Sequence, residues 1–284
     1  MSRWIAGLVF LLLLLPLPSA ATGLAGLIDP IVEGNVLRAG LALPGNLTGD
    51  ISISFEEVEG LSVESLGLSV NVVSLLDLSL LARLRDGNIP AAFPVLLRIE
   101  PPAQGGLSFR GVVSIDVHTH SLLFMPNTPL RLFAASAGGP FEDITASMGM
   151  GSYRARGRKG QFSEFLILLE LRPVNRVINY KLGRIDQILA ANEALIAPVV
   201  FADLTDLAAE IRAEHAARDT QGAIAKVEEF IALVESHSGP EIPDVWSSAG
   251  GVVNVGGSLQ AAAETLRFSL ILKRSQGLLG LPLL

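Results

Sequence analysis

The period of the hydrophobic residues changes near residue 172, and this change constrains the fold of the 284-residue chain more than any other feature. Before it, apolar residues such as Ile115 and Val117 alternate with polar ones. A period of two is typical of strands with one buried face. After it, apolar residues such as Ile178, Leu182 and Ile185 recur every three or four positions, as on one side of a helix. We therefore expect an α+β protein whose strands precede its helices.

The first half predicts seven or eight short strands separated by glycine-rich turns, together with one short connecting helix at 75–85. The clearest strand candidates are 51–55, 66–72, 94–99, 113–117, 130–134, 152–156 and 162–168. Many short strands at this spacing favour an immunoglobulin-like antiparallel β-sandwich over residues 22–172.

The second half predicts an antiparallel helical module over residues 173–284. Pro198 would close its first helix, and Asp203 and Thr220 would cap the next two. A fourth helix is expected from Ser258 to about Leu272, although the end of this segment also alternates like a strand.

The first 21 residues have the layout of a secretory signal peptide. Arg3 precedes an apolar stretch that is too short to span a membrane, and the small residues Ser19 to Ala21 predict cleavage after Ala21. No later apolar run reaches 18 residues, so we expect no transmembrane segment after signal removal. The sequence therefore predicts a secreted or periplasmic protein.

Composition narrows the functional classes. Hydrophobic residues make up 50% of the chain and charged residues 17%, which is enough for a substantial core. The net charge of −7 disfavours nucleic acid as a partner. The chain has no cysteine, so disulfides, thiolate nucleophiles and zinc–sulfur sites are excluded. No hydrolase elbow, P-loop or dinucleotide fingerprint occurs, and the sequence assigns no catalytic or cofactor-binding residue.

Three residues of one predicted strand could bind a metal ion. Asp116, His118 and His120 share one face of the strand because side chains repeat every two residues. Carboxylate and imidazole ligands suit zinc or copper. The alternative is an ordinary solvated sheet face, where polar residues are expected.

A basic cluster forms the second candidate. Arg154, Arg156 and Arg158 alternate along a predicted strand, and Lys159 follows them. Arginines on one face could bind phosphates or acidic sugars. The alternative is an edge strand that its charges protect from aggregation.

Several segments carry a resemblance to known families. Residues 129–133, 139–145 and 162–165 resemble the end of sandwich domains in bacterial surface proteins. The run from Asp219 to Ile242 resembles FIMAH-type helical modules, although Pro240 and Glu241 stand where such modules often carry basic residues. The whole chain, including His118-Thr119-His120, resembles a family of uncharacterised secreted proteobacterial proteins with a domain of unknown function, which implies no assigned activity.

These observations leave three functional hypotheses. The first is an exported, non-enzymatic interaction protein of the bacterial cell envelope that binds a protein or another envelope component. The second is a metal-binding protein or metal-dependent hydrolase that uses Asp116, His118 and His120. The third is a structural packing subunit with the helices as its assembly surface. The sequence does not determine the oligomeric state.

Overall fold

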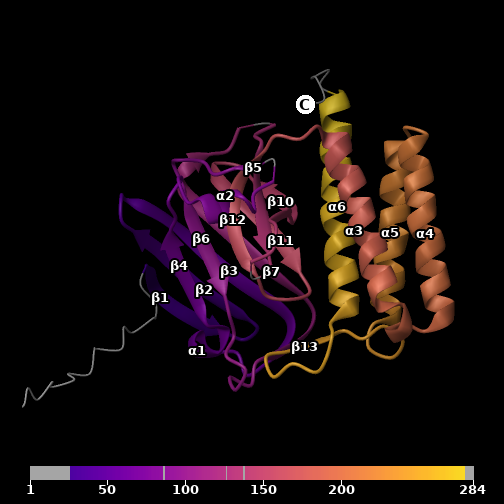
Figure 1. The fold of residues 1–284 in the computed structure, drawn as a ribbon, viewed down its shortest axis with the longest axis horizontal. Helices are drawn as coiled ribbons and strands as arrows, with labels where there is room; N and C mark the ends of the chain where they lie inside the picture. Colours follow the sequence, from indigo (N-terminus) through magenta and orange to yellow (C-terminus); the bar gives the residue numbers. More distant parts are fainter. Residues whose placement is uncertain (1–25, 86, 126, 137, 279–284) are drawn as a thin grey trace, which may run out of the picture.

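The computed structural model describes residues 26–85, 87–125, 127–136 and 138–278. The expected signal peptide lies outside these described residues. Two antiparallel sheets form adjacent layers, and four long helices stand beside them (Figure 1). The α+β class with a C-terminal helical region is thus confirmed.

The larger sheet, sheet A, has two unusually long strands at its centre, β3 and β7, which pair along most of their length. Its strands, in spatial order, are β1 (Leu27–Glu33), β2 (Val36–Leu43), β3 (Leu47–Glu59), β7 (Ser108–Leu123), β11 (Ser152–Lys159) and β10 (Thr145–Gly149), with β13 (Val245–Ser247) paired to one end of β7.

The smaller sheet, sheet B, packs against sheet A. Its strands, in order, are β4 (Leu68–Val72), β6 (Val95–Ile99), β12 (Glu164–Glu170), β8 (Leu130–Ala135) and β9 (Glu142–Asp143), with β5 (Gly87–Asn88) paired to β12. Two short helices connect strands, α1 (Val63–Leu66) and α2 (Leu78–Leu81). The connecting helix that was expected at 75–85 is thus only four residues long, and the Asp77 side chain caps it.

The core between the sheets follows directly from the two-residue alternation. Ile53 and Ile115 of sheet A are fully buried in one cluster with Leu132 and Ile167 of sheet B. Burial of such side chains is worth about 1.5–3 kcal/mol each. The opposite side chains of sheet A therefore form its outer face.

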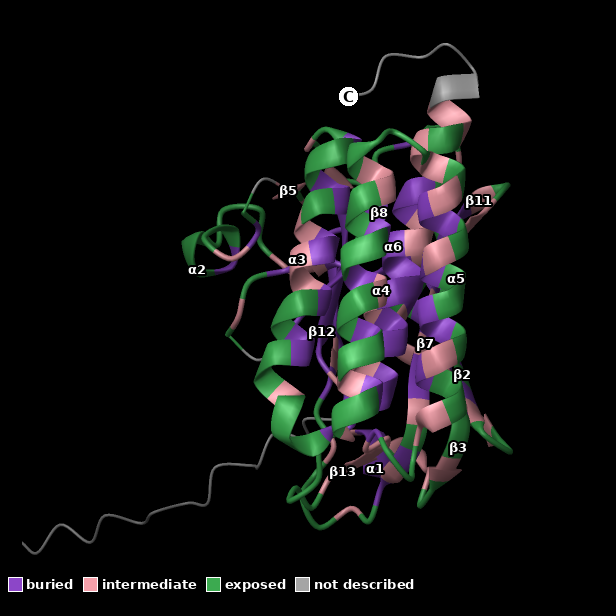
Figure 2. Ribbon diagram, turned by 90° about the vertical axis from the view of Figure 1, so that its right-hand side faces the viewer, coloured by how far each residue is buried: buried purple, intermediate pink, exposed green. Residues whose placement is uncertain are grey.

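The four long helices pack in a ring around their own hydrophobic core. They are α3 (Val174–Asn192), α4 (Pro198–Ala216), α5 (Thr220–His237) and α6 (Val255–Leu278), and a 3₁₀ turn, η1 (Glu193–Leu195), follows α3. Figure 2 shows exposed residues along the outward sides of α4 and α5. Within the described residues, no helix is both long and apolar enough to cross a membrane.

Three helix boundaries differ from the sequence expectation. Pro198 begins α4 rather than closing α3, because proline fits the first turn of a helix, and Asp203 therefore lies inside α4. The cap of α5 is Asp219, whose side chain accepts a hydrogen bond from the Gly222 N–H, and Thr220 is the first helical residue. The last segment is helical and has no strand end up to Leu278.

Helix α6 lies directly against sheet A near the start of the helix. An added Cβ at Gly257 would lie 2.0 Å from the Gly111 carbonyl oxygen of β7, and one at Gly160 would lie 2.5 Å from the Ser258 nitrogen. The buried Asn254 side chain donates to the same Gly111 oxygen at 2.6 Å and accepts from the Gly257 N–H at 2.8 Å. Close backbone approach thus brings the helices over the end of sheet A near Gly111 and Gly160. The opposite end of β7 is left uncovered.

Candidate functional site

The uncovered end of sheet A carries the candidate metal ligands on its outer face. Ile115 and Val117 of β7 point into the core, so Asp116 and His118 point outward. Thr119 is fully buried between the two histidines, and its hydroxyl donates to the Tyr153 carbonyl at 3.1 Å. This inward anchor places His118 and His120 on the same outer side.

Strand register brings a third candidate ligand from β3. Asp50 pairs directly with His118, and Ser52 is the residue opposite Asp116. An added Cβ at Gly49 would lie 2.5 Å from the His118 carbonyl oxygen, so a glycine at this position permits the local approach of the two strands. Asp50 therefore lies beside the histidines.

One carboxylate oxygen contacts both imidazoles. Oδ2 of Asp50 lies 3.0 Å from Nδ1 of His118 and 3.0 Å from Nε2 of His120. The three side chains each offer a ligand atom within 4.8 Å of the others, and this is the one such group of histidines and acids found among the described residues. The two rings are nearly perpendicular, at 74°, with their centroids 5.1 Å apart. We call Asp50, His118 and His120 the Asp-His-His cluster.

The electrostatics of the cluster favour an ionised carboxylate. Partial burial alone would raise the pKa of Asp50, but hydrogen bonds from His120 and His118 outweigh burial and hold this pKa below its ordinary value. The side chains of Asp50, His120 and His118 are 57%, 44% and 23% exposed, so solvent reaches the ligand atoms.

Asp116 lies on the predicted face but does not join the cluster. Its carboxylate pairs with Arg156 at 3.1 Å and with Arg154 at 3.7 Å. The metal-ligand set that the geometry favours is therefore Asp50, His118 and His120, with Asp50 in the place expected for Asp116. Asp50 precedes an alternating strand in the sequence, but only the register between β3 and β7 identifies it as a neighbour of His118.

The structure separates the four basic residues that the sequence grouped. Arg154 and Arg156 lie on the open face, and Arg158 pairs with Glu264 of α6 at 2.6 Å. Lys159 lines a different cavity, between β11 and the helices. The edge-strand interpretation is wrong, because β11 pairs with β7 on one side and β10 on the other.

The Asp-His-His cluster and the two arginines share one shallow concavity of about 750 Å³. Arg38 of β2 also lines it, and a guanidinium nitrogen of Arg154 lies 3.4 Å from Nδ1 of His118. The same surface therefore presents metal-type ligands beside groups that bind anions.

Comparison with known proteins gives a family and no relative of known activity. No curated protein and no solved structure matches the chain significantly. The family model of unknown function DUF6689 matches residues 9–274, which include both sheets and the four long helices except the last residues of α6. The chain therefore belongs to DUF6689, a family of unknown function.

Proposed function

We propose that this protein binds a divalent transition metal, zinc or copper, through the Asp-His-His cluster on the outer face of sheet A. A single observation carries the proposal: the Asp50 carboxylate lies 3.0 Å from a ring nitrogen of each histidine. These three side chains come from two paired strands, which hold them on a rigid support.

The spacing suits a tetrahedral ion. Ligand atoms about 2.0–2.1 Å from a tetrahedral zinc ion lie about 3.3 Å from one another. Two of the three separations are already 3.0 Å, so small side-chain rotations would accommodate the ion. Two imidazoles and one carboxylate favour zinc or copper over calcium or magnesium, which prefer oxygen ligands.

Three protein ligands would leave the fourth position of a tetrahedral ion for a water molecule or an anion. A guanidinium nitrogen of Arg154 lies 3.4 Å from Nδ1 of His118, and its charge disfavours a bare cation. Asp116 takes up part of that charge through its contact with Arg154. An anion or hydroxide bound to the metal would balance the remaining positive charge. A site that favours a metal-bound hydroxide supports metal-dependent hydrolysis as a second candidate function.

The broader role that we propose is that of an exported binding protein of the cell envelope. The signal-like N-terminal sequence supports export, and the lack of a recognisable catalytic motif supports binding without turnover. We also propose, beyond the observed fold, that the two sheets are related to immunoglobulin-like sandwiches of surface proteins. The helices would correspondingly be related to FIMAH-type modules.

Zinc titration by calorimetry tests the metal site. We expect one zinc ion per chain in the wild type and at least about a 100-fold loss of affinity in Asp50→Asn or in His118→Ala with His120→Ala, because each change removes direct ligands. Asp116→Asn is the matched control, and we expect it to weaken binding by no more than about tenfold because Asp116 acts only through Arg154.

Two results would contradict the proposal. One is a metal-free protein that takes up neither zinc nor copper. The other is a larger loss of zinc affinity in Asp116→Asn than in Asp50→Asn, which would indicate that Asp116, and not Asp50, is the carboxylate ligand. Circular dichroism of each variant would establish that a loss of binding does not come from unfolding.

A further inference from the structure

A second cavity, of about 60 Å³, lies between the sheets and the helices and is separate from the Asp-His-His cluster. Residues of β9 and β11 line one side of it, and residues of α3 and α6 line the other. Exposed Gln161 and partly exposed Arg184 belong to its lining, so the cavity communicates with solvent.

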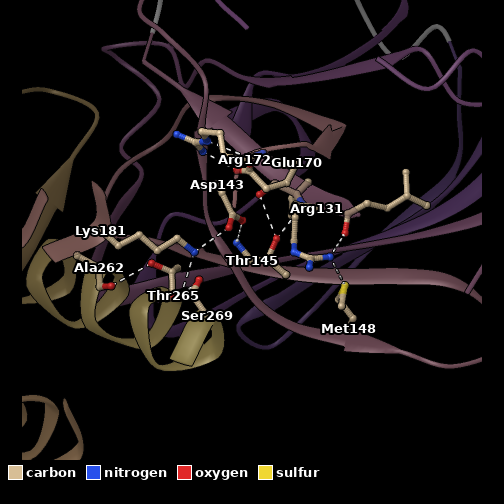
Figure 3. A network of polar contacts seen from close by, with 12 residues as sticks. Arg131, Asp143, Thr145, Met148, Glu170, Arg172, Lys181, Ala262, Thr265 and Ser269 are labelled. Atoms are coloured by element: carbon tan, nitrogen blue, oxygen red, sulfur yellow. Dashed lines mark hydrogen bonds and ion pairs between the residues drawn. The ribbon is translucent and has the colours of Figure 1, made fainter. Parts of the chain in front are cut away.

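Most of the charged groups around this cavity are already paired. Lys181 lies 2.8 Å from Asp143 and donates to the Thr265 carbonyl at 3.0 Å. Figure 3 shows Lys181 reaching from its helix toward both residues. The other residue of β9, Glu142, pairs with Arg184 of α3 at 3.4 Å and accepts from the Tyr180 hydroxyl at 2.7 Å.

Arg158 of β11 also lines the cavity, and it pairs with Glu264 of α6. Lys159 differs from all of these, because its ammonium has no hydrogen bond or ion pair with any residue that the structure describes. Lys159 is therefore the one ammonium or guanidinium of the lining that no described carboxylate contacts directly, and a partly buried charge without a direct partner is costly.

We propose that this cavity binds a small monocarboxylate whose carboxylate group pairs with Lys159. The anion supplies the charge that the lining lacks. Four apolar side chains also line the cavity, Ile144, Ile188, Ala261 and Ala262, and they would contact a short aliphatic tail. A volume of about 60 Å³ holds roughly four to six groups of the size of water, which matches acetate to butyrate.

The electrostatic environment of the Lys159 amine is consistent with carboxylate binding. Burial lowers the pKa of the Lys159 amine, the Glu142 carboxylate opposes this shift, and Arg184 adds to it. A bound carboxylate would restore the stabilisation that the ammonium loses through burial. Phosphate or sulfate, with higher charge and no apolar part, would make no apolar contact with these four side chains.

Titration of ¹⁵N-labelled protein with sodium acetate and sodium butyrate tests the proposal, with sodium chloride at equal concentration as the control. We expect saturable shifts of the Gln161 and Ser258 amides with either carboxylate, and tighter binding of butyrate. Lys159→Met should weaken both at least tenfold. Lys226→Met, an equal change in charge on the α4–α5 surface, should leave binding unchanged.

A second measurement does not depend on any variant. The chain has four lysines, so acetylation of the folded wild type can be followed at each one by peptide mass spectrometry. Butyrate should protect Lys159 and leave Lys226 unprotected. Shifts equal to those of chloride, unchanged binding in Lys159→Met, or no protection of Lys159 would each overturn the proposal.

Discussion

Strands β7 and β11 pass through two different environments, and their charged residues behave differently in each. Under the helices, Arg158 pairs with Glu264 of α6, and nearby Asp143 pairs with Lys181 of α3. On the open half, the partners of Arg154 and His118 among the described residues lie on the sheet itself. The helices therefore supply partners to charged residues on the half that they cover, whereas the charged residues of the open half pair within the sheet and stay accessible to solvent.

The largest expected effect is on the covered half. Lys181→Met would leave the carboxylate of Asp143 buried without its ion-pair partner, since both side chains are at most 5% exposed. We expect a loss of about 3–5 kcal/mol in the free energy of unfolding, measured by urea denaturation. A loss below about 1 kcal/mol would show that the helices do not neutralise this charge.

The same pair predicts a pH dependence. Burial would raise the pKa of Asp143, but Lys181 and Arg131 hold it below its ordinary value. A lowered native pKa gives stabilisation that is complete above the unfolded pKa of about 3.9 and is lost as the pH falls through the native pKa. The stability difference between wild type and Lys181→Met should therefore shrink in acid. A difference that grows below about pH 4 would contradict this assignment.

A substitution at the contact of α6 with β7 tests how the helices are held over the sheet. Gly257→Ala places a methyl group 2.0 Å from a backbone oxygen, so we expect a destabilisation of about 1–3 kcal/mol by thermal unfolding. Gly183→Ala of α3 is the matched control, because nothing lies within 4 Å of its added Cβ. We expect this control to stabilise the protein by about 0.5–1 kcal/mol. Equal effects of the two changes would argue against close contact at Gly257.

The smallest effect is expected on the open half. Arg156→Ala removes an ion pair between Asp116 and an arginine that is 51% exposed, so the free energy of unfolding should change by about 0–1 kcal/mol. A loss of unfolding free energy as large as that of Lys181→Met would show that ion pairs on the two halves of the surface contribute equally to stability.

Local sequence patterns predicted much of the fold and one side of the candidate site. The alternation around Ile115 predicted which face of β7 is buried, and it placed His118 and His120 outward together. Asp50 could not be identified in this way, because the register between β3 and β7 depends on contacts over 68 residues of sequence. Lys159 was grouped with the arginines for the same reason, since nothing local indicates that α3 and α6 close a cavity over it.

The most direct test of the account is a crystal of the protein soaked in zinc, with anomalous diffraction measured at the zinc edge. We predict one strong peak on the outer face of sheet A, about 2.0–2.2 Å from Asp50, His118 and His120. A peak beside Asp116 without contact to Asp50, or no peak on this face at a zinc concentration that saturates other sites, would contradict the account.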